Sequence, residues 1–297
     1  MRISTQSLFR SIQRNILRQA NELKKIEEKV ASGKNMNRLS DDPVALVSSL
    51  GLRNTLERIG QYQRNMDMGK SWLDLSTTVI KQGSELADRA QKISTELSTG
   101  TQTAEMRASL SAEISEIMDE AAGLGNTQLS GKYIFAGYQT GTAPFSKTTS
   151  GGLETVLYAG DTNNFQIAVG PNENLTLGKN GQEVWVDSGL FTSLGNLKQA
   201  IDNNDLAGIR QQAVALQSAE DYLNAQESDV GIRQNRLQRK QEILSQLNLT
   251  LQNQLDGLEN ADYNEVIVEM QQQQKAYEIA LEASAMVSQV SLLDYLQ

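Results

Sequence analysis

Carboxylates carry most of the chemistry that this chain of 297 residues could perform, because it contains no cysteine and no histidine. These two absences exclude thiol nucleophiles, serine–histidine–aspartate triads, histidine bases and the usual zinc sites. They also exclude disulfide bonds, so packing or assembly has to supply the stability of the fold.

Adjacent acids occur as three pairs, which are Asp41-Asp42, Asp119-Glu120 and Glu220-Asp221. Neighbours on a helix point about 100° apart, which favours solvated faces for the last two pairs. Asp42 directly precedes Pro43, the order of an N-cap and a first helical residue, so we expect capping here rather than cation binding. The glycine-rich pieces at 151–152 and 178–181 match no phosphate-binding or dinucleotide fingerprint. We therefore predict no enzymatic activity, no cofactor and no metal site.

The charge and hydropathy of the chain argue against two further classes of protein. The formal net charge is −9, whereas binding to nucleic acid needs an excess of lysine and arginine. The sequence contains no apolar run long enough to cross a bilayer, so we expect no membrane insertion.

Glycine divides the chain into three parts, because fourteen of the 22 glycines lie between Gly123 and Gly208. Residues 44–122 and 209–297 contain no proline, as long helices require. The sequence therefore predicts a mainly α-helical protein with a β-rich insertion. Candidate strands cover residues 133–138, 153–158, 165–169, 175–177 and 184–186. Asn180-Gly181 predicts a hairpin between the last two.

The first helical part begins with an apolar seam whose spacing alternates between three and four residues, which is typical of coiled coils. Its apolar members are Phe9, Ile12, Ile16, Leu23, Ile26 and Val30. Gly33 is the expected C-cap, and two further helices should follow from Pro43 and from about residue 106. The first 21 residues hold four arginines and no acid, which also suits a presequence, but the unbroken seam favours a coiled-coil strand.

The last part repeats a leucine or valine every seven residues from Leu216 to Leu258, which predicts one long coiled-coil helix. A final helix restarts after Asp262 with a weaker seam. The members of this seam are Ile267, Met270, Gln274, Tyr277, Leu281, Ser284, Ser288, Leu292 and Tyr295.

The two ends of the chain differ in charge. Residues 1–30 carry a net charge of +4 and residues 259–297 a net charge of −6. Opposite charges and similar seams predict that the terminal helices pair, either within one chain or between subunits. Because such helices gain most of their stability from packing, we expect both ends to be poorly ordered in a free monomer and to fold on assembly.

The combination of these features resembles the bacterial flagellins. The resemblance rests on the terminal heptad helices, the central β-rich insertion, and the segments ASGKNMNRLSDDP at 31–43 and DVGIRQNRL at 229–237. The opening MRIST and the segment GKYIFAG at 131–137 are more similar to the hook-associated branch of this family. The resemblance covers about residues 1–140 and 215–297, and it matches no motif in the intervening segment.

The resemblance implies a structural, non-enzymatic subunit of the bacterial flagellum that joins hook to filament. It implies export through the flagellar type III channel to an extracellular location, with help from a cytoplasmic export chaperone. The implied partners are further copies of the chain in a ring, a neighbouring hook-associated protein and flagellin.

The implied fold is an elongated helical coiled coil or bundle formed by both terminal segments, with a small central β domain. Residues 1–43 and 259–297 would be inner coiled-coil helices, 44–130 and 189–258 the two halves of a helical shaft, and 131–188 an outer β domain. The predicted assembly surface comprises Phe9, Ile12, Ile16, Leu23, Ile26, Val30, Met270, Tyr277, Leu281, Leu292 and Tyr295.

Three alternatives stay open at this point. A short filament flagellin would share the seams but would polymerise alone. An unrelated secreted coiled-coil adhesin or tip protein would share the helices but would have no flagellar partner. A carboxylate glycosidase would need two carboxyl groups about 5–10 Å apart in the middle segment.

Overall fold

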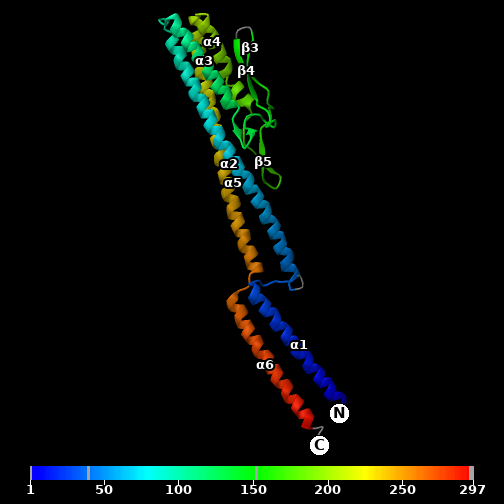
Figure 1. The fold of residues 1–297 in the computed structure, drawn as a ribbon. Helices are drawn as coiled ribbons and strands as arrows, with labels where there is room; N and C mark the ends of the chain where they lie inside the picture. Colours follow the sequence, from blue (N-terminus) through cyan, green and yellow to red (C-terminus); the bar gives the residue numbers. More distant parts are fainter. Residues whose placement is uncertain (1, 39–40, 151–152, 294–297) are drawn as a thin grey trace. The chain divides into compact units, whose positions relative to one another are not determined.

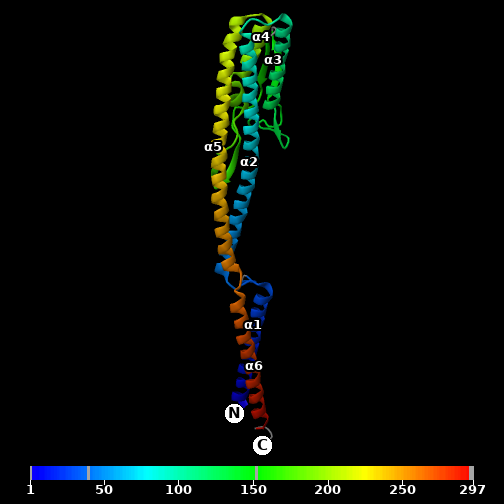
Figure 2. The same ribbon diagram turned by 90° about the vertical axis from the view of Figure 1, so that its left-hand side faces the viewer.

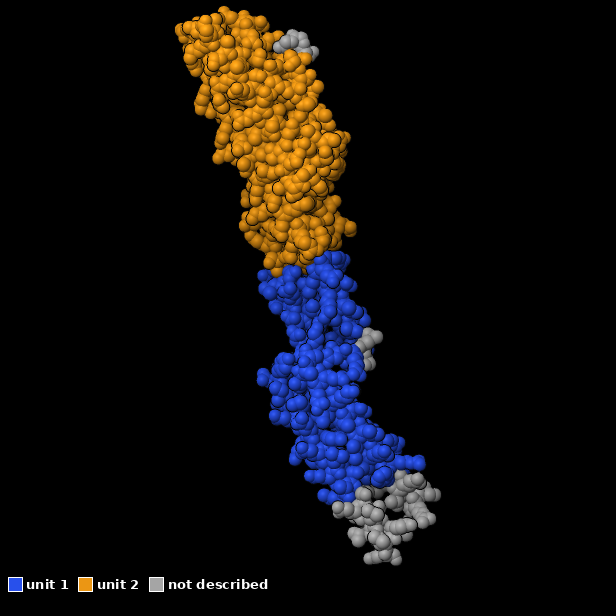
Figure 3. Space-filling view, in the orientation of Figure 1, with its two compact units in different colours: residues 1–58, 246–297 blue, residues 59–245 orange. Residues whose placement is uncertain are grey.

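The computed structural model describes residues 2–38, 41–150 and 153–293, without the side chains of residues 2–6, 8, 150 and 287–293. In these residues, six α-helices are interrupted in the middle of the chain by three antiparallel strand pairs (Figure 1). The mainly helical fold with a small β-rich insertion is therefore as predicted. The chain divides into two compact units (Figure 3): a terminal unit of residues 1–58 and 246–297, and a central unit of residues 59–245.

The terminal unit is built on the first and last helices, α1 (Arg2–Ser32) and α6 (Tyr263–Leu293). They lie side by side and antiparallel, with both chain ends at the same end of the pair (Figures 1 and 2). The unit also contains the start of α2 (Pro43–Leu97) and the end of α5 (Leu206–Glu259).

The two connections of the terminal unit are tied to each other by backbone hydrogen bonds. Gly33 ends α1 with a φ of +68°, as the predicted C-cap requires. The Asn35 amide donates to the Glu259 carbonyl at 2.7 Å, and the Ala261 amide donates to the Gly33 carbonyl at 3.0 Å. The Asp42 carboxylate accepts from the amides of residues 44 and 45 at 3.0 and 2.9 Å. It caps α2, as expected.

In the central unit, α2 and α5 run side by side, and each helix buries a residue at every seventh position of one apolar line (Figures 1 and 2). The buried α5 residues are Leu216, Leu223, Val230, Leu237 and Leu244, and the matching α2 residues are Ile59, Met66, Leu73, Ile80 and Ala87. The predicted long coiled-coil helix is confirmed, and Gly231 does not interrupt it. Ser94 lies seven residues after Ala87 on the same line and is also buried. Its hydroxyl donates to the Ile209 carbonyl at 2.9 Å, so this polar side chain has a hydrogen-bond partner.

Two shorter helices and the strands complete the central unit. α3 (Ala104–Gly125) and α4 (Leu190–Asp202) pack together and against the hairpin of β3 (Phe145–Ser150) and β4 (Leu153–Tyr158). A second hairpin pairs β5 (Gln166–Gly170) with β6 (Glu173–Thr176), and a short one pairs β1 (Gln128–Leu129) with β2 (Lys132–Tyr133). Gly195 of α4 has no room for a side chain, since a Cβ there would lie 2.3 Å from the Glu154 carbonyl oxygen.

Two details of the predicted β region are wrong. Of the predicted strand at 133–138, only Tyr133 lies in a strand, and Asn180-Gly181 is not a hairpin turn. β6 pairs with β5 instead, and Gln182–Val186 forms one turn of π-helix. The physical reason is the burial of Trp185, which packs edge-on against Phe135 with a centroid distance of 5.9 Å. A helical turn brings this indole into the core between the strands and α4.

Candidate assembly surface

The seam predicted on α1 faces α6, but it is covered unevenly. Ile26 is buried at 6% exposure, and Ile12, Ile16, Leu23 and Val30 are half-buried. Phe9, the seam residue nearest the N-terminus among those predicted, is 54% exposed.

The seam on α6 follows a slightly different line from the predicted one. Val266 is buried and Met270, Gln273 and Tyr277 are half-buried, whereas the predicted Ile267 and Gln274 are exposed. Leu281 is 43% exposed. The side chain of Leu292 and the whole of Tyr295 lie outside the described residues.

The open question of how the terminal helices pair has a clear answer in the structure. α1 and α6 of the same chain contact each other along their length. The Gln273 amide nitrogen donates to the Gln19 side-chain oxygen and, at 3.3 Å, to the Gln19 carbonyl oxygen. Pairing therefore occurs within one chain, and it places a polar contact in the middle of an otherwise apolar seam.

Burial of apolar side chains is strongly biased towards the central unit. Of 42 buried apolar residues among the described side chains, only Ile26 and Val266 belong to the terminal unit. Of 20 large apolar residues that are exposed, thirteen belong to the terminal unit, although it holds only about a third of the chain. The terminal unit is therefore a helical structure without a completed core.

Several of these exposed residues were not predicted from the sequence. At the start of α2, Val44, Val47 and Leu50 are 77%, 68% and 50% exposed. Their spacing of three residues, directly after the cap at Asp42, could have predicted an apolar face at the start of this helix. On α6, the exposed large apolar residues outside the predicted seam are Tyr263, Val268, Ile279 and Met286.

The loop from α1 to α2 is held in place by charged side chains. The Arg38 guanidinium binds the Glu28 carboxylate through two contacts of 2.9 and 3.0 Å. The Asp41 carboxylate accepts from the amides of Arg38 and Asn37 at 2.8 and 3.2 Å. The hydrogen bond from the Arg38 amide is the main reason that the pKa of Asp41 lies below its usual value. Both acids of the Asp41-Asp42 pair therefore stabilise backbone structure.

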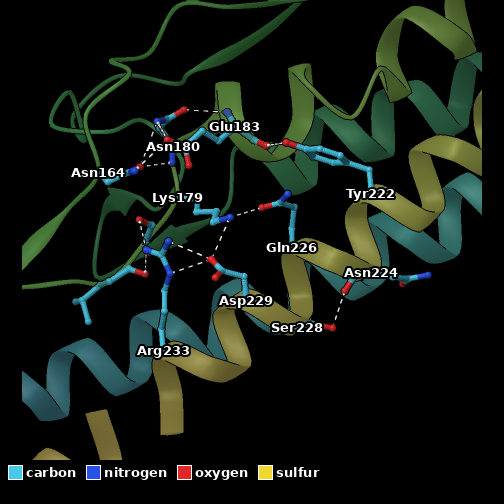
Figure 4. A network of polar contacts seen from close by, with 12 residues as sticks. Asn164, Lys179, Asn180, Glu183, Tyr222, Asn224, Gln226, Ser228, Asp229 and Arg233 are labelled. Carbon is cyan, nitrogen blue, oxygen red and sulfur yellow. Dashed lines mark hydrogen bonds and ion pairs between the residues drawn. The ribbon is translucent and has the colours of Figure 1, made fainter. Parts of the chain in front are cut away.

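A polar stripe on α5 fastens the β-rich region to this helix within the central unit (Figure 4). The Tyr222 hydroxyl donates to the Glu183 carbonyl at 2.9 Å, and Lys179 binds Asp229 at 3.0 Å. Arg233, one helical turn after Asp229, binds the same carboxylate at 3.0 Å. Burial raises the pKa of Asp229, but the two cations outweigh burial and leave it below its ordinary value. The segment at 229–237 that carried part of the family resemblance thus has a structural role.

Asn180 is the buried centre of the same network. Its side-chain amide donates to the Thr162 carbonyl at 2.7 Å and to Asn164 at 3.1 Å, and its side-chain oxygen accepts from the Glu183 amide at 2.9 Å. The position that was predicted to form a turn therefore joins the segment at 162–164 to the start of the π-helical turn.

The part of the chain that the structure describes shows neither a membrane span nor an acidic metal site. No helix there has the length and hydropathy that a membrane span needs. Acidic side chains there form no cluster of three or more that could coordinate a metal ion.

Comparison with known proteins agrees with the fold. The model of the bacterial flagellin N-terminal helical region matches residues 3–140, and that of the C-terminal helical region matches residues 214–296. Flagellar hook-associated protein 3 of Salmonella typhimurium is 25% identical over 302 residues, which cover 93% of this chain and 93% of that protein. The protein of the same name from Escherichia coli is 30% identical over 186 residues, which cover 62% of this chain and 57% of that protein.

A solved structure shows the same fold. The flagellar junction protein FlgL from Legionella pneumophila superposes with a TM-score of 0.57 at 14% identity, over 73% of this chain and all of that one. Together, the two family models match well over half of the sequence. The chain therefore belongs to the bacterial flagellin family, and it is a structural subunit of the flagellum.

Proposed function

We propose that this chain joins hook to filament by packing its terminal unit against the terminal units of neighbouring subunits. The observation that carries the proposal is the incomplete core of that unit, in which the described apolar side chains include only two that are buried, Ile26 and Val266, and thirteen large ones that are exposed. A monomeric protein rarely exposes so much apolar surface unless another molecule covers it.

The energy available from this surface is sufficient for assembly. Full burial of one leucine, isoleucine or phenylalanine side chain contributes about 1.5–3 kcal/mol. Association costs about 4–15 kcal/mol in lost freedom of movement. Covering Phe9, Leu281 and a few of their exposed neighbours would therefore offset that cost, whereas covering one alone would not. Assembly should need several contacts at once, as at the tip of a growing structure.

The proposed organisation assigns different tasks to different segments. Residues 1–43 and 259–297 form the inner coiled-coil segments and hold the assembly surface: Phe9, Ile12, Ile16, Leu23, Ile26, Val30, Met270, Tyr277, Leu281, Leu292 and Tyr295. Residues 44–130 and 189–258 form the shaft, and residues 131–188 form an outer β domain. The compact core of the central unit and the polar stripe of α5 support this division, because they let the β domain stay folded without neighbours.

The proposed partners are further copies in a ring, a hook-associated protein on one side and flagellin on the other. Export through the flagellar type III channel and a cytoplasmic chaperone belong to the same proposal. The exposed apolar residues of α1 and α6 support a chaperone, because such a surface promotes aggregation before assembly.

The test adds purified protein to cells that carry hooks but from which the gene for this subunit has been deleted. The chain should bind at hook tips and permit filament growth when flagellin follows. Ile16→Asp should abolish binding while circular dichroism still shows wild-type helix content, whereas Asn15→Asp, which places the same charge on an exposed neighbour, should leave binding intact. Long filaments formed by the chain alone at high salt would identify a filament flagellin instead, and failure of the wild type to bind hooks would refute the junction role.

A further inference from the structure

α1 and α6 carry opposite charges on faces that point away from each other. From this arrangement we infer that the basic outer face of α1 in one copy docks on the acidic outer face of α6 in the next copy. The inference rests on the proposed function, and it specifies which surfaces meet and in which order.

The outer face of α1 is basic. The side that packs on α6 contains Ile12, Ile16 and Ile26, and positions about half a turn away from them lie on the opposite side. There the structure exposes Leu17, at 56%, and the arginines that flank it. These arginines are Arg10, Arg14 and Arg18.

The outer face of α6 is apolar with acidic flanks. The side that packs on α1 contains Val266, Met270 and Tyr277. Opposite to it lie the exposed side chains of Val268, Ile279 and Met286, at 52%, 55% and 65%. The acids on and beside this outer face are Glu265, Glu278 and Glu282, and all three are exposed. Exposed Lys275 lies on the same face and forms an ion pair with Glu278, which leaves the face acidic overall.

The opposite charges are not used within the chain. Among the described residues, no ion pair joins α1 to α6; the pairs that involve these helices are Glu22–Lys25 and Lys275–Glu278, each within one helix, and Glu28 with Arg38 of the loop. Arg10, Arg18, Glu265 and Glu282 have no ion-pair partner there. Most of the charged side chains on the two outer faces are therefore available to pair with another molecule.

A second copy of the chain is the occupant that fits both faces. Each copy carries one basic face and one acidic face, and Leu17 can meet the exposed residues of the α6 face. When α1 of one copy meets α6 of the next, the second copy still presents a free α1 face. Such a head-to-tail contact generates rings or helical arrays rather than closed dimers. Exposed charges of this kind mainly select partner and orientation, while the exposed apolar side chains of the terminal unit supply most of the affinity.

The test reverses the charge of each face and then mixes the variants. One variant carries Arg10→Glu, Arg14→Glu and Arg18→Glu, and the other carries Glu265→Arg, Glu278→Arg and Glu282→Arg. Labelled full-length protein is added to hooks of cells that lack the subunit, so export does not affect the result. Each variant alone should bind at least about ten-fold less protein per hook than the wild type, because all its faces have one sign.

An equal mixture of the two variants should recover binding to within about three-fold of the wild type, because opposite faces then alternate between copies. Circular dichroism must show wild-type helix content for each variant alone. A mixture that stays defective would overturn the inference, since the charges would then act within the chain or toward a different protein. Normal binding by either single variant would also overturn it. Neither result would affect the proposed function, whose own test is Ile16→Asp.

Discussion

Glu259 and Arg53 form an ion pair that joins two helices of the terminal unit. Glu259 is the last residue of α5, and its carboxylate accepts from Arg53 of α2 at 2.8 and 2.5 Å. Lys34 of the connecting loop approaches the same carboxylate at 3.3 Å, and the side chain of Glu259 is only 12% exposed. A unit with almost no apolar core is thus held together at its connections by charge.

This contact predicts a pH dependence. The hydrogen bond from Arg53 is the main cause of the lowered pKa of Glu259, which lies below the ordinary value of 4.5. A depressed carboxyl pKa adds stability that is fully present above the unfolded pKa and is lost as the pH falls through the folded pKa. Opening of the connection should therefore become more frequent only below pH 4.5.

Amide hydrogen exchange at Asn35, which donates to the Glu259 carbonyl, measures this opening. Glu259→Gln should exchange faster than the wild type at neutral pH, and the ratio of the two rates should approach one as acid protonates Glu259. Glu265→Gln, on an exposed acid of α6, serves as the control and should leave the ratio near one throughout. A Glu259→Gln ratio that does not change with pH would contradict the assignment.

Substitutions on α6 and α1 should separate assembly from folding. Leu281→Asp should leave the free chain folded, because this side chain is already 43% exposed, yet it should prevent assembly by placing a charge in the proposed interface. Ile26→Asp should destabilise the terminal unit by about 3 kcal/mol or more, because it puts a charge at a buried site. Circular dichroism and hook binding distinguish the two outcomes. Loss of helix content in Leu281→Asp would show that the residue supports the monomer instead.

Much of this fold could be predicted because heptad spacing and caps are local properties of a sequence. The α5 heptad from Leu216 to Leu244 and the cap at Asp42 are examples, since each depends on residues within one or two turns. The turn at Gln182–Val186 could not be predicted, because burial of Trp185 against Phe135 overrides the local preference of Asn180-Gly181 for a hairpin.

The candidate surface was predictable only in part, for a different physical reason. An apolar seam shows that a helix face will be covered, but it does not show by which chain. Ile26 and Val266 are covered within the monomer, whereas Phe9 and Leu281 are not. The spacing of α6 also allowed two neighbouring lines, through Val266 and Gln273 or through Ile267 and Gln274, and the contact with Gln19 favours the first.

The polar network at Asn180 gives a prediction for the β domain. Asn180→Ala should destabilise the central unit by about 1–3 kcal/mol, because it leaves the partly buried Thr162 carbonyl and Glu183 amide without these partners. Asn224→Ala, on an exposed position of α5 nearby, is the matched control and should have little effect. Urea denaturation monitored by the fluorescence of the buried Trp72 and Trp185 provides the measurement. Equal effects of the two substitutions would show that the network contributes nothing specific.

Two glycines in helices should respond in opposite ways to replacement by alanine. Gly195→Ala should cost about 1–3 kcal/mol, because its Cβ would lie 2.3 Å from the Glu154 carbonyl and β4 would have to move. Gly231→Ala should stabilise the protein by about 0.5–1 kcal/mol, because a Cβ there meets nothing within 4 Å and alanine favours the helix. Thermal unfolding of both variants tests this. Stabilisation by Gly195→Ala would mean that β4 is not packed on α4 as described.

Limited proteolysis of the free chain tests the division into two units. The terminal unit exposes Arg10, Arg14 and Arg18 on a helix whose core contacts are sparse, so local opening there should be frequent and trypsin should cut it first. The central unit holds all but two of the buried apolar residues among the described side chains, and its Lys147 is restrained by Asp119 and Glu154 at 2.9 and 3.0 Å.

Mass spectrometry should therefore find early loss of both ends and a resistant fragment that lies within about residues 45–255 and contains most of residues 59–245. Early cleavage at Lys147, with both ends intact, would reverse this order of stability and would mean that the terminal helices are complete without neighbours.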